Sequence, residues 1–258
     1  MLGKAKTLTG YSLQSLDGEI GTVKDFYFDD HYWTIRYLVA DTGEWLISRK
    51  VLISPHSLAG VDADQGSITV KLTRDQIEHS PTLNRDKPVS RQFERAYFGF
   101  YGLPMYFGFE HGRVKAGQFA QTTKKRGDPD LRSTHDVSGH HVEASDGEIG
   151  HVEDFLIDDQ TWAIRYLIVD TKDWLPGKRV LISPKWIERV SWSEKQVVVD
   201  LTREAIQQAP EYTDSPPLTR DQEIALHRHY KRPGYWDTEA GGVDDLELSG
   251  EHPWRFLG

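Results

Sequence analysis

Histidine is the residue type in this chain whose grouping best suits chemistry, because neutral imidazole nitrogens are common metal ligands. Four of the 11 histidines gather near the middle of the chain, at His135, His140, His141 and His151, and the last three are the candidate metal ligands. His140 and His141 are adjacent, so on a strand their side chains would point to opposite faces. Either one could still meet His151 across the expected turn at 146–147. A metal site is therefore one hypothesis, and surface histidines that bind nothing are the favoured alternative.

Acidic residues form a second set of candidates. Asp25 and Asp29 return 129 residues later as Asp154 and Asp158, and such carboxylates could bind a cation. The alternative is structural, because aspartates favour turns by accepting hydrogen bonds from their own backbone. Asp25 lies beside Arg36 in the expected sheet, where it could form an ion pair or occupy a bulge. The spacing of a calcium-binding loop is absent, so structural roles are the favoured interpretation.

Motifs for covalent or phosphate chemistry are missing. The sequence has no nucleophile elbow, no P-loop and no dinucleotide-binding glycine motif. Ser54 and Ser183 both precede a proline, where a hydroxyl is better placed to cap a turn than to attack a carbonyl carbon. The sequence therefore predicts a protein that is not an enzyme and that uses no cofactor.

Two aromatic segments, which we call the aromatic arms, are the strongest candidates for a binding surface. Arm 1 is 101–107 and arm 2 is 230–236, and both keep Tyr, Pro, Tyr and a final large ring at the same spacing. The residues concerned are Tyr101, Pro104, Tyr106, Phe107, Tyr230, Pro233, Tyr235 and Trp236. Each ring presents about 150–250 Å² of surface, so something must cover it. Either the arms fold back as latches on a domain of the same chain, or they form a surface for a homodimer or another partner.

The elements that would position these residues occur twice. Residues 10–107 correspond to residues 139–236 without a gap, and about 39 of the 98 paired positions are identical. This period is too long for a solenoid or a propeller, whose repeats span roughly 20–50 residues. Each copy is therefore expected to be a domain, with shared positions serving the fold and unshared positions open to function.

Each copy begins with strands. Turn signals come every 8–12 residues, which is typical of a small all-β domain, and the Asp-Gly pairs at 17–18 and 146–147 predict hairpins. In the first copy, strands are expected at 20–28, 33–40, 45–47, 51–53 and 67–72. In the second copy, they are expected at 149–157, 162–169, 174–175, 180–182 and 196–201.

Helices are expected after the strands. Thr73 and Gln76 form a capping-box sequence, and the short helix that follows should stop before Pro81. A longer helix should start near Ser90, and its counterpart near Thr219. The expected fold class is mainly β with short helices: two small β-barrels, each followed by a helix and an aromatic arm, related by a pseudo-twofold axis.

Composition bounds the remaining choices. The chain has 258 residues, 31 basic and 40 acidic side chains, a net charge of -9 and no cysteine. The acidic balance argues against general nucleic-acid binding, and no apolar run is long enough to cross a membrane, so a cytoplasmic protein is expected. The expected domains are a first repeat at 1–107, a linker at 108–135, a second repeat at 136–237 and a C-terminal tail at 238–258.

The ordered motifs at 17–26, 35–39 and 51–55, which return in the second copy, resemble the PRC-barrel domain. This is the small β-barrel module shared by the cytoplasmic part of the photosynthetic reaction centre H subunit and the C-terminal domain of a ribosome maturation factor. The resemblance covers about four fifths of the chain, and its arrangement is similar to that of bacterial stand-alone tandem PRC-barrel proteins. It implies a protein–protein interaction module. The membrane helix of the H subunit and the N-terminal domain of the maturation factor lack counterparts here, so neither specific role is carried over.

The resulting hypothesis is a non-catalytic scaffold or adaptor that binds unidentified proteins, or a second copy of itself. One alternative is a ribosome-associated or RNA-processing protein, for which the basic residues at 124–126 are the support in the sequence. A second alternative is a metal-binding protein that uses the histidines of the second copy.

Overall fold

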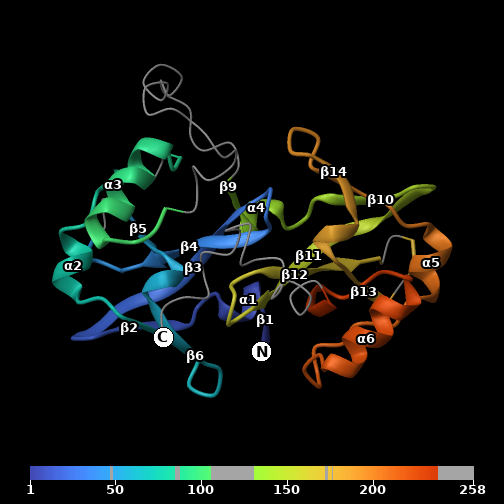
Figure 1. Cartoon of the computed structure of the whole chain (residues 1–258), viewed down its shortest axis with the longest axis horizontal. Coiled ribbons are helices and arrows are strands. Elements are labelled where there is room, and N and C mark those ends of the chain that lie inside the picture. Colours follow the sequence, from blue (N-terminus) through green and yellow to red (C-terminus); the bar gives the residue numbers. More distant parts are fainter. Residues whose placement is uncertain (47–48, 85–87, 106–130, 172–173, 176, 238–258) are drawn as a thin grey trace.

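The computed structural model describes residues 1–46, 49–84, 88–105, 131–171, 174–175 and 177–237. The protein is mainly β with short helices and consists of two similar halves, repeat 1 (residues 1–105) and repeat 2 (residues 131–237). The two repeats lie side by side along the longest axis of the molecule (Figure 1).

The elements of the two repeats follow one another in the same order, except that β8 of repeat 1 has no counterpart among the described strands of repeat 2. Repeat 1 contains β1 (Leu2–Lys4), α1 (Ala5–Leu8), β2 (Ser12–Ser15), β3 (Gly18–Asp29), β4 (Thr34–Asp41), β5 (Arg49–Ile53), η1 (Pro55–Ser57), β6 (Leu58–Asp62), β7 (Ser67–Val70), α2 (Arg74–Glu78), β8 (Leu83–Asn84) and α3 (Arg91–Tyr101). Repeat 2 contains β9 (Leu131–Ser133), α4 (Thr134–Val137), β10 (His141–Ala144), β11 (Gly147–Asp158), β12 (Ile164–Asp170), β13 (Arg179–Ile182), η2 (Pro184–Trp186), β14 (Ile187–Ser191), β15 (Gln196–Val199), α5 (Arg203–Gln208) and α6 (Arg220–His229).

Each repeat builds one sheet, and the strand order is the same except that repeat 1 adds the edge strand β8. The main path is β6-β7-β2-β3-β4-β5-β8 in repeat 1 and β13-β12-β11-β10-β15-β14, written from the opposite edge, in repeat 2. The long strands β3 and β11 begin at the predicted Asp-Gly turns, where Gly18 and Gly147 have φ of 140° and 139°. Positions 21 and 150 have no room for a side chain, because a Cβ on Gly21 or Gly150 would lie 2.0 Å from the carbonyl oxygen of Asp41 or Asp170, respectively. The shared glycines thus fix the geometry of both sheets.

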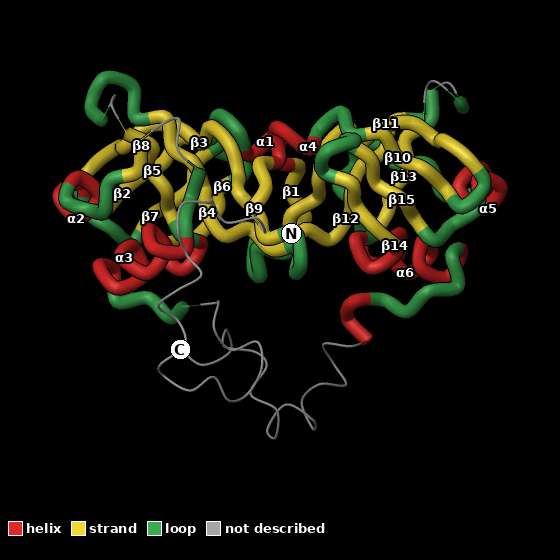
Figure 2. Tube along the Cα trace, turned by 90° about the horizontal axis from the view of Figure 1, so that it is seen from above, coloured by secondary structure: helices red, strands yellow, loops and turns green. Residues whose placement is uncertain are grey.

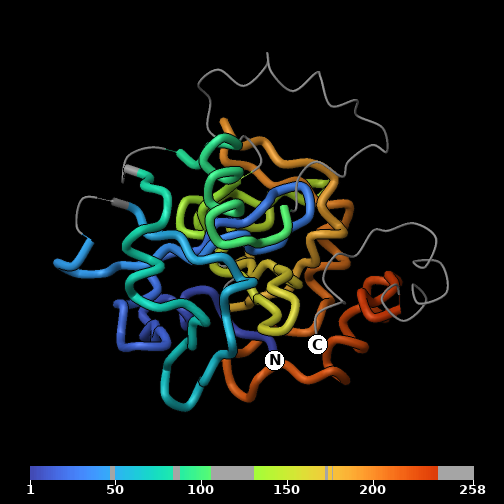
Figure 3. The backbone as a smooth tube through the Cα atoms, turned by 60° about the vertical axis from the view of Figure 1, so that its left-hand side comes forward, coloured from blue at the N-terminus to red at the C-terminus, as the bar shows by residue number. Residues whose placement is uncertain are grey.

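The repeats exchange their first strands. Strand β1 of repeat 1 pairs with β11 of repeat 2, and β9 of repeat 2 pairs with β3 of repeat 1. Strands β1 and β9 therefore lie at the centre of the molecule, with α3 and α6 on one face (Figure 2). The N-terminus accordingly lies beside the part of the chain that belongs to repeat 2 (Figure 3).

The β3–β4 and β11–β12 turns complete this junction. The backbone N–H of Ile35 donates to the Trp162 carbonyl at 2.8 Å, and the N–H of Ile164 donates to the Trp33 carbonyl at 2.7 Å. Trp33 and Trp162 adopt left-handed φ values of 53° and 58°, which are unfavourable for bulky residues unless their surroundings impose them. The shared tryptophans therefore serve the inter-repeat junction.

The hydrophobic core runs through both repeats. One cluster of buried side chains includes residues of both, and the rings of Phe28 and Phe155 meet across the junction with centroids 5.9 Å apart. A second, smaller cluster lies under α3 in repeat 1, where it surrounds Tyr37, Tyr97 and Phe98. Because the larger core is continuous, the repeats form one packed unit.

Most of the predicted elements are confirmed, but one strand of each copy is wrong. The described part of the segment at 45–47 is a turn, and so is 174–175. Trp45 N–H donates to the Thr42 carbonyl, and its ring lies under the Arg74 guanidinium at 4.6 Å. Trp174 repeats this arrangement with Arg203 at 4.7 Å. These aromatic residues favour a strand by propensity, but the turn and the cation–π contact decide their conformation.

The helix starts agree with the prediction. Thr73 and Gln76 form both hydrogen bonds of a capping box at the start of α2. Ser90 caps α3 and Thr219 caps α6. Residues 131–135, which we expected within the linker, belong to β9 and the start of α4 instead. The remainder of that segment and the tail at 238–258 lie outside the described residues.

Candidate functional site

An open groove lies where the two repeats meet. Repeat 1 contributes the turn at 30–33 between β3 and β4, and repeat 2 contributes residues of β12, η2 and β14 together with Tyr235 of arm 2. The groove has a volume of about 730 Å³. Its walls are held together by the bridge between Thr34 and Ala163, so the groove is a product of the inter-repeat junction.

One wall is held by an arginine that occurs in both repeats. Arg165 donates from Nε and Nη2 to Oδ2 of Asp158 at 3.0 and 2.8 Å, and its guanidinium lies 3.9 Å from the centroid of the Tyr235 ring. Burial is the largest single influence and acts to raise the pKa of Asp158, but hydrogen bonds from Arg165, the Gln160 N–H and Thr161, together with the charge of Arg165, outweigh it, and the pKa is lowered. The carboxylate is therefore ionised at neutral pH and fixes both Arg165 and the ring of Tyr235.

The opposite wall is also held by an arginine that contacts a carboxylate and an aromatic ring. Arg132, on the exchanged strand β9, donates from Nε to Oδ2 of Asp30 at 2.9 Å, and its guanidinium lies 4.6 Å from the centroid of the Trp192 ring. Asp30 belongs to repeat 1 and Trp192 to repeat 2. This arginine therefore connects a groove residue of one repeat to a groove residue of the other.

The groove also presents exposed polar and aromatic side chains. Tyr32 exposes 50% of its surface, and Lys185, Glu188 and Arg189 are exposed on η2 and β14. Aromatic rings stack on flat groups and apolar chains, and exposed cations attract acidic ones. This combination suits the binding of another molecule.

The exposed lining is not repeated on the other side of the molecule. Lys185, Glu188, Arg189 and Trp192 correspond to His56, Ala59, Gly60 and Ala63 in repeat 1. Tyr32 and His31 correspond to Thr161 and Gln160 in repeat 2. In contrast, Arg165 and Asp158, which hold the wall, are repeated as Arg36 and Asp29 and form the same ion pair at 3.2 Å. Both repeats therefore contain the ion pair that holds the groove wall, whereas the exposed lining residues occur on one side of the molecule.

A buried network of tyrosine, glutamate and arginine side chains joins α6 to Tyr235 of the groove. Oε1 of Glu223 accepts hydrogen bonds from the hydroxyls of Tyr166 at 3.0 Å and Tyr235 at 2.9 Å. Its Oε2 pairs with Arg220 at 3.1 Å, although only 3% of Glu223 is exposed. Burial is the main reason why the pKa of Tyr166 is raised, and it raises the pKa of Tyr235 to about 12.

Repeat 1 contains the same network. Tyr37 donates to Oε1 of Glu94 at 2.9 Å, and Arg91 pairs with Oε2 of Glu94 at 3.2 Å. Glu94 is fully buried. Sequence reasoning missed these residues, although the identity of Tyr, Glu and Arg at corresponding positions in both copies was a usable signal. A buried glutamate on an amphipathic helix needs such partners.

Arm 2 is a latch on its own repeat. Tyr230 and Tyr235 are each 7% exposed, and Trp236 packs on the ring of His227 with centroids 5.0 Å apart. The Pro233 side chain is exposed, but its carbonyl contacts Nδ1 of His227 at 2.8 Å. Of the residues predicted in this arm, Tyr235 reaches the groove and the others hold the arm in place.

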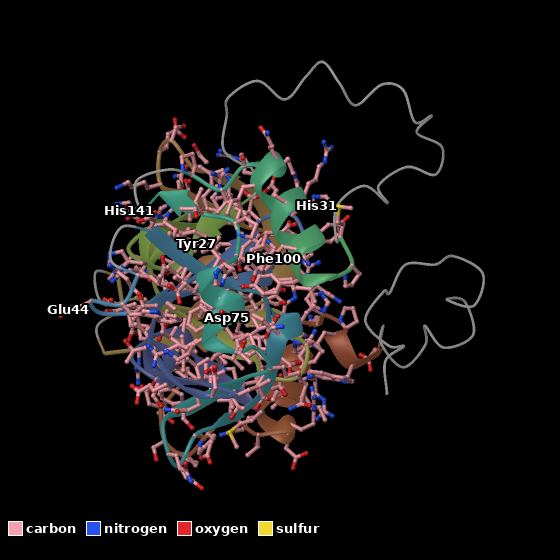
Figure 4. All side chains as sticks on the ribbon, turned by 90° about the vertical axis from the view of Figure 1, so that its left-hand side faces the viewer. Tyr27, His31, Glu44, Asp75, Phe100 and His141 are labelled. Atoms are coloured by element: carbon pink, nitrogen blue, oxygen red, sulfur yellow. The ribbon has the colours of Figure 1, made fainter. Side chains whose placement is uncertain are left out.

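Arm 1 is described only in its first part. Tyr101 is half-buried against Tyr97, with ring centroids 4.8 Å apart, and Pro104 is exposed. Tyr106 and Phe107 lie outside the described residues. Phe100 and Met105 expose 46% and 44% of their surface, and Phe100 lies on the side of repeat 1 that carries α3 (Figure 4).

The two arms differ where arm 2 turns. A Cβ added to Gly234 would lie 2.1 Å from Cε2 of Trp236, so the turn of arm 2 requires glycine. The corresponding residue in arm 1 is Met105, and the corresponding residue to His227, which anchors arm 2, is Phe98. The two arms therefore share their aromatic spacing but differ at the two positions that hold arm 2.

The three candidate metal ligands do not converge. His140 is buried with its ring 6.0 Å from that of Trp192, whereas His141 is exposed and its Nδ1 contacts Glu148 at 2.7 Å. His151 lies opposite His141 in the strand register, and its Nε2 is 3.9 Å from Asp170. Among the residues described, no group of three or more His, Asp or Glu side chains could hold a metal ion. The metal-binding alternative has no support from this geometry.

The recurring acids have structural positions. Asp25 and Asp154 each sit beside a bulge in their strand, as one of the two predicted interpretations had it. Asp25 accepts hydrogen bonds from the hydroxyls of Ser133 at 2.6 Å and Thr134 at 3.0 Å, at the start of α4 in the other repeat. Asp154 accepts from the backbone N–H of Lys6 in α1 at 3.2 Å. Each aspartate thus caps the first helix of the opposite repeat, which the linear sequence does not reveal.

Comparisons with known proteins agree with this architecture. The family model described as the PRC-barrel domain matches residues 4–77 and 129–206. A search of curated proteins finds no match. Within the described residues, no helix is both long enough and apolar enough to span a membrane.

Proposed function

This chain belongs to the PRC-barrel domain family, matched once in each of its two repeats, and from that premise we propose that it is a non-catalytic scaffold that binds other proteins through the inter-repeat groove. PRC-barrel domains are in general protein-interaction modules. The observation that carries the proposal is the groove itself, whose framework is shared by both repeats and whose exposed side chains are not.

The groove favours a macromolecular partner over a small substrate. Its lining includes exposed Tyr32, half-buried Trp192 and exposed Arg189, and Tyr, Trp and Arg are enriched at protein interfaces. The ribosome-associated alternative gains nothing from the described residues, because the basic segment at 124–126 lies outside them and the chain carries a net charge of -9. The predicted homo-oligomer remains an expectation that the experiment below also addresses.

A photo-crosslinking amino acid at the groove tests this proposal. It replaces Trp192 in one variant and Ala63, its counterpart in repeat 1, in a matched control. Both proteins are expressed in the native cell, and crosslinked species are identified by mass spectrometry. We expect a reproducible protein partner from the Trp192 position that the Ala63 position does not capture. Equal capture from both positions, or none from Trp192, would contradict the proposal.

A further inference from the structure

We propose that the tail at 238–258 binds in the inter-repeat groove of its own chain through residues 253–257, and that a protein partner must displace it there. Occupation of the groove by the tail does not depend on the proposed function, and only the competition with a partner rests on it. The inference follows from the place where the tail begins, from its length, and from the side chains that the groove and the tail present to each other.

The tail begins beside the groove. Tyr235 lines the groove, and its hydroxyl donates to Oε1 of Glu223 at 2.9 Å. Two residues later, Oδ2 of Asp237 accepts a hydrogen bond from the Gly234 N–H at 2.8 Å, and the Asp237 N–H donates to the Gly234 carbonyl at 3.2 Å. Asp237 is therefore fixed within two residues of a groove wall, and the tail starts at that wall.

The tail is long enough to reach across the groove. The 16 residues at 238–253 separate Asp237 from Trp254. A segment of this length spans up to about 50 Å when extended, far more than the width of a groove of about 730 Å³. A tethered segment is also present at a local concentration on the order of 1 mM. A modest intrinsic affinity is therefore enough to keep the groove occupied.

The tail carries large apolar side chains that need cover. Trp254, Phe256 and Leu257 follow a stretch, 238–252, in which glycine and acidic residues predominate. Removing large apolar side chains from water is favourable, and clusters of them mark association sites. These three residues therefore favour a bound position over a solvated one.

The groove presents aromatic surfaces for these side chains. Tyr32 exposes 50% of its surface, and Trp192 is half-buried, so the rings of the tail have aromatic partners in the groove. Pro253 precedes Trp254, and prolines dock on aromatic-lined grooves in other peptide-binding domains. The segment at 253–257 therefore matches the exposed rings of the groove.

Charge is complementary at the same wall. Strand β14 exposes Glu188 and Arg189 side by side, so the wall presents both signs of charge. The tail carries Glu251 and Arg255 on either side of Trp254, and each can meet the opposite charge of β14. Exposed ion pairs contribute little free energy, so these charges orient the segment more than they hold it.

Other places on repeat 2 and repeat 1 fit the tail less well. A smaller cavity between β13, α6 and the loop at 210–218 has a volume of about 100 Å³, which is room for about three water molecules and too little for an indole and a phenyl ring together. In the equivalent place on the other side of the molecule, Ala63 and Thr161 replace Trp192 and Tyr32, so that place lacks both rings.

A photo-crosslinking phenylalanine analogue at position 256 of the full chain tests where the tail binds. The protein is irradiated at low concentration, and crosslinks in the monomer are mapped by mass spectrometry. We expect crosslinks within one chain to peptides that contain Tyr32 or Trp192. Tyr32→Ala should lower the yield at the Trp192 peptide by about fivefold or more, because it removes an exposed ring. Leu16→Ala, at a position that is 67% exposed and outside the groove lining, should leave it within about twofold.

Changes in the tail itself supply a second matched comparison. W254A/L257A, made in the chain that carries the crosslinker, should lower the yield by about fivefold or more, because it removes the apolar contacts. L246A/L248A removes two apolar side chains outside the proposed segment and should keep the yield within about twofold.

Competition is measured with a fluorescein-labelled peptide of residues 249–258 by fluorescence polarisation. The peptide should bind W254A/F256A, whose own tail cannot compete, about tenfold more tightly than it binds the parental chain. This factor follows from a local tail concentration on the order of 1 mM and an intrinsic Kd of about 0.1 mM. L246A/L248A should behave as the parental chain does. With the crosslinker at Trp192, W254A/F256A should capture about threefold more protein partner, or more, than the parental chain.

Several results would overturn the inference: crosslinks from position 256 to the cavity at 210–226 or to α3, no crosslinks, or equal peptide binding by W254A/F256A and the parental chain. Crosslinks to the groove found only in dimers would show that the tail of a second copy is the occupant. Unchanged partner capture in W254A/F256A would remove the competition.

These failures are distinguishable from a failure of the proposed function. If position 256 crosslinks elsewhere while Trp192-specific crosslinks to a partner persist, the proposed function stands and this inference falls. If the tail crosslinks to the groove but no partner is captured at Trp192 even in W254A/F256A, the proposed function falls and occupation of the groove by the tail stands.

Discussion

At the scale of single residues, the most informative side chains are two buried glutamates. Glu94 and Glu223 lie in apolar surroundings, and each has tyrosine and arginine partners in the same geometry. A buried carboxylate is costly unless every partner is present, so loss of one partner should cost more than loss of a surface ion pair.

The first prediction concerns Glu223. We expect Glu223→Ala to lower the free energy of unfolding by about 3–5 kcal/mol, because the tyrosine hydroxyls and Arg220 would lose their shared acceptor. Urea denaturation measures the change. Glu194→Ala, at an exposed position, should alter stability by less than about 0.5 kcal/mol. Similar losses in both variants would show that the network does not stabilise the fold.

The second prediction concerns His227 and pH. Burial, the main influence, lowers the pKa of His227 from its ordinary value of 6.5, despite the opposing effects of Pro233 and Glu223. The unfolded chain therefore binds a proton more readily, and stability from this residue is complete above about pH 6.5 and is lost as pH falls. His227→Phe installs the residue of repeat 1 and should make stability between about pH 5 and 7 less dependent on pH.

Denaturation at a series of pH values checks this slope. His135→Gln, at an exposed position, is the control and should keep the parental dependence. Buried His140 and half-buried His56, whose pKa values are also lowered by burial, should retain part of the slope in His227→Phe. An unchanged slope in that variant would refute the assignment.

At the scale of elements, the two arms share an aromatic pattern but differ at the residues that hold arm 2 in place. Arm 2 folds back because Gly234 leaves room for the Trp236 ring and because His227 meets the Pro233 carbonyl. Arm 1 has Met105 and Phe98 at those places. Aromatic spacing predicted a latch or an interface in both arms, and the latch of arm 2 depends on two further residues, Gly234 and His227.

The third prediction tests that turn. Gly234→Ala should destabilise the protein by about 1–3 kcal/mol, since a Cβ at this position overlaps the Trp236 ring and forces the arm outward. Gly99→Ala is the matched control in α3, where a Cβ would meet no atom within 4 Å. It should stabilise the helix by about 0.5–1 kcal/mol. Tryptophan fluorescence should shift to the red in Gly234→Ala alone.

At the scale of the whole molecule, the two repeats depend on each other. They exchange first strands, cap each other's first helices and share one core. Such a molecule is a dimer within one chain, and neither half retains its full sheet without the other.

The fourth prediction follows from this exchange. We expect the full chain to unfold in one cooperative transition, and Ile68→Ala in repeat 1 should speed hydrogen exchange in the core strands of both repeats. Ile68 is fully buried, and its truncation should cost about 2–5 kcal/mol. Two separate thermal transitions, or a change confined to repeat 1, would contradict a shared folding unit.

The sequence determined the local features of this protein. Asp-Gly turns, helix caps at Thr73, Ser90 and Thr219, and most strands follow from backbone preferences and hydrophobic patterns that neighbouring residues settle among themselves. The duplication of residues 10–107 at 139–236 also indicated two domains of one family. The turns at Trp45 and Trp174 were missed, because propensity favours a strand and a distant arginine decides otherwise.

Tertiary structure decided everything that joins distant residues. The partners of Asp25 and Asp154, the strand exchange and the groove all depend on contacts between repeats, and no local pattern states which surfaces will meet. Tyr235 was a candidate from sequence, but its place in the groove depends on Arg165 and Glu223. The sequence therefore specified two similar domains. Their packing formed the candidate groove, because only packing brings together residues that differ between the repeats on elements that both repeats contain.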